Sequence, residues 1–188
     1  MKNIAAATIA IGLILFSIPN WSNAADTDAS SGAASLLNKA NQMNNEEEDM
    51  ANLLHKKAGD NQALTTLSDT LKADHKANQA AAEALAHQKN IKLDSYTKDK
   101  ATYDRLSDLS GASFNNAFFT AAIKDHRQAI STFEEAKGTA ADRDMKIYID
   151  QTIPVLQSHL RMVENLRRDS AAGSPENPAN NRAETSKR

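Results

Sequence analysis

The chain has 188 residues with 22 basic and 24 acidic side chains, and its net charge of −2 argues against a general nucleic-acid-binding protein. It contains no cysteine, which excludes disulfides, thiolate metal sites, cysteine nucleophiles and lipidation of a thiol. Alanine, leucine and lysine are abundant and valine is rare, so the composition favours an all-α fold. The length fits a single hydrophobic core.

Residues 1–24 have the order of residues that is typical of a secretory signal peptide. Lys2 is followed by an apolar run from Ile4 to Ile18 and by small residues that end at Ala24. The apolar run is too short to be a convincing membrane span. We expect cleavage after Ala24 and an exported protein, periplasmic or secreted or associated with the outer membrane. An uncleaved anchor is the alternative.

Four long segments with helical composition follow, separated by glycine-containing or polar breaks. They cover about residues 33–58, 62–89, 112–136 and 141–168, and a shorter helix is expected near 99–108, between the second and the third. Long helices joined by two tight turns and one longer connection predict an up-and-down four-helix bundle. Pro154 falls inside the fourth segment, where it should kink the helix.

The segments that flank this domain differ from it in composition. Residues 25–32 are expected to be flexible. Residues 169–188 collect proline, glycine, serine and asparagine with almost no large apolar side chain, so that burial cannot offset the entropy cost of ordering them. We expect a disordered C-terminal tail.

Each long segment places one polar side chain on its apolar face. Residues three and four apart share a face of a helix, and the inward series of the second, third and fourth segments contain His75, His126 and His159. The first segment contributes Glu47 in the same way. Asp74 and Asp125 directly precede two of these histidines and lie about 100° round the helix from them.

Counting residues from the turns tests whether these side chains can meet. Glu47 and His75 lie 13 and 15 residues from the turn near Asp60, which places them within ~3 Å in height at 1.5 Å per residue. His126 lies 13 residues before the turn near Thr139 and His159 lies 20 residues after it. This predicts a mismatch of ~10 Å unless the Pro154 kink or an offset turn absorbs it.

Two interpretations of the polar layer remain open. Imidazole and carboxylate ligands together suit iron, zinc, copper or manganese, so Glu47, His75, His126 and His159 could bind a transition metal. Asp74 and Asp125 would then accept hydrogen bonds from ligating histidines of other helices. In the other interpretation the histidines and carboxylates only bind one another and fix the register of the helices.

A dinuclear carboxylate centre is not expected. The Glu-x-x-His pairs of di-iron bundles require a glutamate three residues before a ligating histidine. Lys72, Ile123 and Leu156 occupy those positions. No glycine-rich loop or strand is predicted that would support a hydrolase triad, a phosphate loop or a dinucleotide site, so neither catalytic residues nor an organic cofactor are predicted.

Three stretches carry a resemblance to a known family. "LKADHKAN", "LSDLSGASFNNAFFTAAIKDHRQAISTFEEA" and "YIDQTIPVLQSHLRMVENL", in this order, resemble the exported bacterial family catalogued as domain of unknown function 4142. The resemblance covers about residues 33–166. The resemblance implies a ferritin-like four-helix fold. Proteins of this family are often labelled as outer-membrane proteins, and no activity is assigned to the family.

The resemblance also implies which residues form the family's polar core. These are Asp74, His75, Asp125, His126 and His159, together with a first-helix glutamate that maps to Glu48 without a gap and to Glu47 with a first turn one residue longer. The helical phase favours Glu47. Where the family usually has an aspartate and a tyrosine, this chain has Asn115 and Phe118 or Phe119, which weakens an enzymatic interpretation.

The sequence therefore predicts an exported ferritin-like protein that is non-enzymatic and acts in binding or in the envelope stress response, with a core metal site. A metal-dependent oxidase or peroxide-handling protein is one alternative. A structural or interaction protein with purely architectural histidines, acting through a protein partner or a homodimer, is the other.

Overall fold

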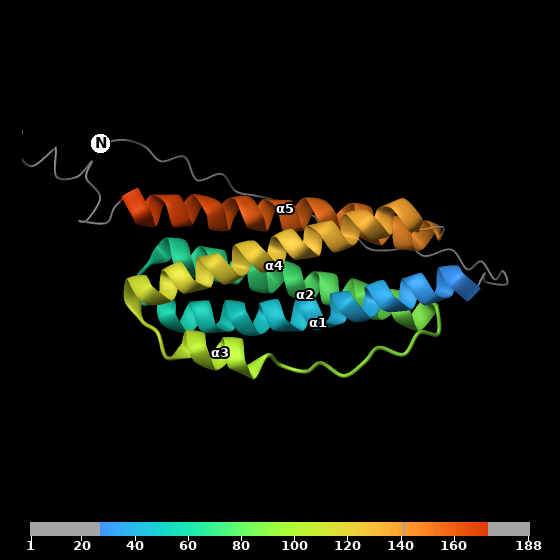
Figure 1. Ribbon diagram of the computed structural model, residues 1–188, viewed down its shortest axis with the longest axis horizontal. Coiled ribbons are helices and arrows are strands. Elements are labelled where there is room, and N and C mark those ends of the chain that lie inside the picture. The colour runs from blue at the N-terminus through green and yellow to red at the C-terminus, as the bar shows by residue number, and fades with distance from the viewer. Residues whose placement is uncertain (1–26, 141, 173–188) are drawn as a thin grey trace, which may run out of the picture.

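A computed structural model describes residues 27–140 and 142–172, which form five helices and no strand (Figure 1). The helices are α1 (Thr27–Ala58), α2 (Gln62–Gln88), α3 (Lys100–Ser107), α4 (Gly111–Thr139) and α5 (Arg143–Ala172). The all-α class is confirmed, and the short helix expected in the longer connection is α3. The predicted signal peptide lies outside the described residues.

The ends of the helical domain extend beyond the predicted limits. α1 begins at Thr27, so most of the segment 25–32 that we expected to be flexible is helical. α5 continues to Ala172, so the first four residues of the predicted tail are helical too, and the rest of it lies outside the described residues. The predicted limits followed the apolar stripes, and both helices continue past these stripes.

α1 and α2 are antiparallel, and so are α4 and α5. A connection that travels the length of the bundle joins the two pairs (Figure 1). α2 and α4 consequently run in the same direction, so the expected up-and-down order is wrong at this step. The physical reason is the reach of the connection. α2 has 27 residues and is about 40 Å long, and the eleven residues from 89 to 99, nearly extended, span most of this length.

Side chains of α1 hold this connection against the bundle. Asn41 Nδ2 donates to the carbonyl of Asp94 at 2.7 Å, and Gln42 Nε2 donates to the carbonyl of Ser95 at 3.0 Å. The short turn between α1 and α2 has its own signals. Gly59 adopts a φ of +54° directly after α1, where glycine is favoured, and the Asn61 side chain accepts hydrogen bonds from two backbone amides at the start of α2.

The apolar core consists of two clusters. One is built mainly from residues 50–58, 64–71 and 114–123, with Val163. The other is built from residues 33–40, 82–86, 129–133 and 145–156. The gaps between these stretches contain the buried polar side chains Asn44, Glu47, His75, His126 and His159. A polar layer therefore lies between the two apolar clusters, and all four long helices contribute to it.

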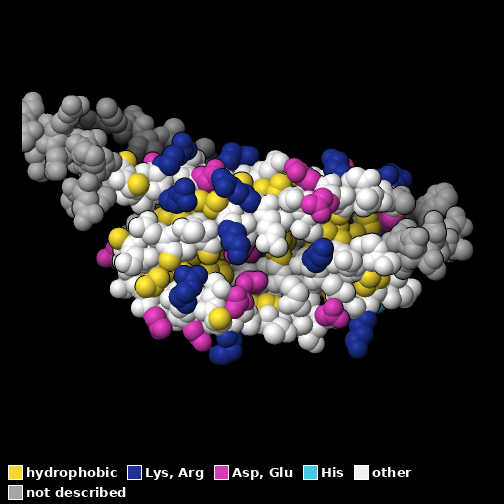
Figure 2. Space-filling view, in the orientation of Figure 1, with side chains coloured by type: hydrophobic (Ala, Val, Ile, Leu, Met, Phe, Trp, Pro, Cys, Tyr) yellow, Lys and Arg dark blue, Asp and Glu magenta, His cyan; other side chains and the backbone are white. Residues whose placement is uncertain are grey.

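The surface shows no concentration of one type of charge on the face drawn in Figure 2, where acidic and basic side chains are interspersed. Among the described large hydrophobic side chains, only Ile147 is exposed. Within residues 27–140 and 142–172, no helix combines the length and the apolar character needed to cross a membrane.

Candidate metal centre

Three histidines from three helices meet in the polar layer. His75 on α2, His126 on α4 and His159 on α5 are each at most 2% exposed. One ring nitrogen of each lies within 4.8 Å of those of the other two, and the ring centroids are 5.0–5.5 Å apart. Among the described residues, these three histidines form the group whose ligand atoms lie close enough together to share a metal ion.

The hydrogen bond on the far side of each ring fixes which nitrogen carries the hydrogen. The three partners are all oxygens that can only accept. The contacts are His75 Nδ1 to Asn44 Oδ1 at 3.0 Å, His126 Nδ1 to the Ala122 carbonyl at 2.9 Å, and His159 Nε2 to Asp74 Oδ2 at 2.9 Å. In a neutral imidazole the other nitrogen then carries a lone pair. Three lone pairs are left for the interior, on His75 Nε2, His126 Nε2 and His159 Nδ1.

Two of these nitrogens have the spacing of metal ligands. His126 Nε2 and His159 Nδ1 are 3.3 Å apart. Two nitrogens bound to one tetrahedral zinc ion at 2.0–2.1 Å lie about 3.3–3.4 Å from each other. His75 Nε2 is buried without any hydrogen-bond partner. A shift of up to about 1.5 Å at one ring would bring all three nitrogens to tetrahedral spacing.

The protonation states of His75 and His126 suit metal binding. Burial lowers the pKa of His75 well below its usual value, and the neighbouring His159 and His126 lower it further. Burial also lowers the pKa of His126, against the opposing effects of the Ala122 carbonyl and Asp125. Both rings are therefore neutral at pH 7, the form in which imidazole binds a metal.

The depth mismatch between His126 and His159 is smaller than we expected, because the count treated the turn as a single residue near Thr139. α4 ends at Thr139 and α5 begins at Arg143, so His126 lies 13 residues before the end of one helix and His159 lies 16 after the start of the next. The remaining difference of three residues corresponds to about 4.5 Å, which a tilt of the helices can absorb.

Glu47 lies beside the cluster, on the outer side of one ring. Its Oε1 is 3.5 Å from His126 Nδ1, the nitrogen that faces away from His159. Burial raises the pKa of Glu47 to about 8, and the charge of Asp125 adds to this effect, so the carboxyl group is neutral at pH 7. Glu48, the other candidate for the core carboxylate, is only half-buried.

The two aspartates of the Asp-His pairs have different surroundings. Asp74 accepts the Nε2 hydrogen of His159, a histidine of another helix, as the helical phase predicts. Asp125 is half-buried and makes no side-chain hydrogen bond to a histidine among the described residues. Its charge instead raises the pKa of Glu46 and Glu47. Asp74 thus orients one of the three rings, whereas Asp125 acts on the carboxyl groups of α1.

Comparison with known proteins places the chain in a family. A family model described as "Domain of unknown function (DUF4142)" matches residues 19–166. The chain belongs to the DUF4142 family. A solved structure, described as a crystal structure of a DUF305 fragment from Deinococcus radiodurans, is similar in fold to this DUF4142 chain, with a TM-score of 0.66 and 12% sequence identity. The similarity covers 72% of this chain and 94% of the fragment, and at this identity it shows the fold alone.

A search among curated proteins gives no match for this DUF4142 chain.

Four residues of the DUF4142 site were not predicted from the sequence. Asn44, Asn78, Tyr148 and Thr152 form a hydrogen-bonded chain that ends at His75. Asn78 and Thr152 lie in the inward series that identified the histidines, and Asn44 precedes Glu47 by one turn. Helical phase therefore marks these residues as interior, but it cannot show which of them pair across helices.

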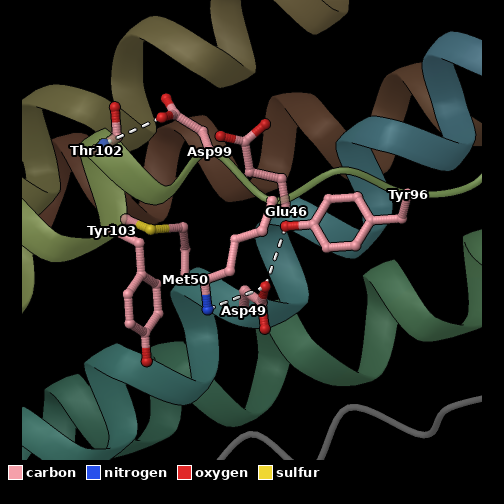
Figure 3. A pocket seen from close by; sticks show the side chains of 8 residues that line it. Glu46, Asp49, Met50, Tyr96, Asp99, Thr102 and Tyr103 are labelled. Atoms are coloured by element: carbon pink, nitrogen blue, oxygen red, sulfur yellow. Dashed lines mark hydrogen bonds and ion pairs between the residues drawn. The ribbon is translucent and has the colours of Figure 1, made fainter.

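A shallow surface hollow lies on the α1 side of the DUF4142 domain, next to Glu46 and the α2–α3 connection (Figure 3). Its volume of about 10 Å³ suits one water molecule at most. Two of its charged groups are paired, because Asp49 binds both the Tyr96 hydroxyl at 3.0 Å and Lys98 Nζ at 3.3 Å. The three histidines do not line this hollow.

Proposed function

We propose that this DUF4142 protein binds one transition-metal ion through His75 Nε2, His126 Nε2 and His159 Nδ1. The convergence of three buried ring nitrogens, of which His75 Nε2 has no hydrogen-bond partner, is the observation that carries the proposal. Leaving a buried acceptor unsatisfied costs about 1–3 kcal/mol. A bound cation would satisfy all three acceptors at once.

Hydrogen bonds among the histidines alone, without a metal ion, account for less of this geometry than a bound metal ion does. A proton on His159 Nδ1 could bridge to His126 Nε2, but 3.3 Å is long for a charge-assisted hydrogen bond, which is about 2.7–2.9 Å. Such a proton would also leave His75 Nε2 without a partner. A metal ion accounts for both the spacing and the unpaired nitrogen.

The ligand set favours zinc or copper among the predicted metals. Imidazole nitrogens suit zinc, copper, iron and nickel, whereas manganese favours oxygen ligands. Glu47 lies on the outer side of His126, 3.5 Å from Nδ1, so in this arrangement it contacts a ligand rather than the ion. A dinuclear iron centre would need more carboxylates than the polar layer contains.

We also propose that the protein is ferritin-like, exported and non-enzymatic. One long crossover connection is the topology of ferritin-like bundles, and bundles of this type bind metals between facing helices. The signal-peptide pattern of residues 1–24 supports export. Almost complete burial of the three rings favours storage or sequestration of an ion over catalysis on a substrate. Association with the outer membrane, a protein partner or a second copy remains a prediction.

Titration of the untagged, metal-free mature protein with Zn²⁺ and Cu²⁺ tests the proposed function. We expect one ion per chain for the wild type and loss of this binding in the His75→Ala, His126→Ala double variant. The matched control is His55→Ala, His87→Ala, which removes two exposed histidines instead. The absence of stoichiometric binding in the wild type, or equal losses in both double variants, would contradict the proposal.

A further inference from the structure

We propose that a directional chain of hydrogen bonds, from the backbone carbonyl of Tyr148 to the ring of His75, sets the tautomer of His75. Asn44, Asn78 and Thr152 are then positioning residues that keep His75 Nε2 free as a ligand atom. The inference about the tautomer stands on the hydrogen bonds alone. Only its consequence for metal affinity rests on the proposed function.

The direction of the first hydrogen bond is fixed, because a backbone carbonyl can only accept. The Thr152 hydroxyl donates its single hydrogen to the carbonyl of Tyr148, one turn earlier in α5, at 2.8 Å. The Asn78 side-chain atom that lies 2.7 Å from Thr152 Oγ1 must therefore be a donor, because the hydroxyl has no second hydrogen to give. This assigns the Asn78 amide nitrogen to the Thr152 side.

The next links follow from that assignment. Asn78 turns its oxygen away from Thr152, and this oxygen accepts both the Tyr148 hydroxyl and the Asn44 amide, each at 2.8 Å. Because the Asn44 amide nitrogen donates to Asn78, the Asn44 amide oxygen faces His75 Nδ1, at 3.0 Å. An amide oxygen can only accept, so His75 carries its hydrogen on Nδ1 and its lone pair on Nε2.

Burial makes this order of donors and acceptors strict. Asn44, His75 and Thr152 are at most 2% exposed, so water cannot easily replace a missing partner. The chain of bonds passes from α5 to α2, on to α1 and back to α2. His75 Nε2, at its end, is the nitrogen that has no partner. Reversing one amide would require reversing the next one and would move the hydrogen of His75 onto the ligand nitrogen.

The test replaces Thr152 by valine, which keeps the shape of the side chain and removes the hydroxyl. Nitrogen-15 NMR of the histidine rings in the metal-free protein should show only the Nδ1-H form of His75 in the wild type. In Thr152→Val the Asn78 amide is free to turn, so we expect a population of the Nε2-H form. Metal affinity should fall about 10–100-fold, as for other groups that orient a ligand.

Two further variants separate this effect from a general loss of structure. Thr120→Val removes an exposed hydroxyl that makes the same kind of bond, to the carbonyl of Asn116, and should change neither readout. Thr152→Ser keeps the hydroxyl, so it should retain the wild-type tautomer. If the valine variant does not fold, the tautomer of His75 in the wild-type protein remains the test.

An Nε2-H form of His75 in the wild type, or a folded Thr152→Val with unchanged tautomer and affinity, would overturn the inference. A wild-type protein that has the expected tautomer but binds no metal would contradict the proposed function and leave this inference standing.

Discussion

Replacement of His126 by leucine is expected to abolish metal binding and, at the same time, to stabilise the metal-free protein. The leucine has a similar volume at a site that is 1% exposed, and it removes a lone pair that lies 3.3 Å from that of His159 Nδ1. The Ala122 carbonyl, which loses the hydrogen bond from the ring, keeps the helical one from the backbone amide of residue 126, so no buried acceptor is left unsatisfied there. We expect a gain of about 1–2 kcal/mol, or about 2–8 °C in melting temperature.

Thermal unfolding with and without added metal measures both effects. Metal should raise the melting temperature of the wild type, because it binds the folded state, and should leave His126→Leu unchanged. The loss of affinity should exceed the roughly 10–100-fold loss expected for a residue that only orients a ligand. His87→Leu, an exposed position, is the control. A metal-free His126→Leu protein that melts below the wild type would favour the architectural interpretation, in which the variant breaks a buried hydrogen bond.

The metal-free protein is expected to lose stability between about pH 5 and pH 8 through Glu47. Burial and the charge of Asp125 raise its pKa from 4.5 to about 8, while His159 lowers it and Glu46 raises it to a smaller extent. Across this range the unfolded chain has released the proton that the folded protein still holds, so stability falls as the pH rises. Above pH 8 the effect is complete, at about 3–5 kcal/mol.

Glu47→Gln isolates this contribution, because the amide keeps the shape and cannot ionise. Urea unfolding from pH 5 to pH 8 should show that the variant gains stability over the wild type with increasing pH. Glu48→Gln, the half-buried neighbour, should follow the wild type. Parallel curves for wild type and Glu47→Gln would show that Glu47 ionises normally in the folded protein.

Helical phase accounts for most of what could be predicted about the site. A histidine that takes the place of a leucine in a 3,4 repeat must point inward, and His75, His126 and His159 do so. The same argument placed Asp74 against a histidine of another helix. The side of a helix on which a residue lies depends only on its spacing from other residues of that helix. This spacing can be read directly from the sequence.

Relations between helices could not be predicted in the same way. The height of His159 depended on where the fourth long helix begins, and α5 begins at Arg143, two residues later than predicted. Whether α4 runs parallel or antiparallel to α2 depended on whether the connection travels the length of the bundle or turns back at once. Asn44 and Asn78 pair across two helices, and such pairings follow from the packing rather than from the residue types. The position of Glu47 on the outer side of His126 likewise required the relative rotation of α1 and α4.

Anomalous diffraction from crystals of the zinc-loaded or copper-loaded protein tests the central claim most directly. The account predicts one metal peak per chain in the polar layer, about 2.0–2.1 Å from His75 Nε2, His126 Nε2 and His159 Nδ1. A metal peak elsewhere on the chain, or no peak among the three rings at saturating metal, would contradict it.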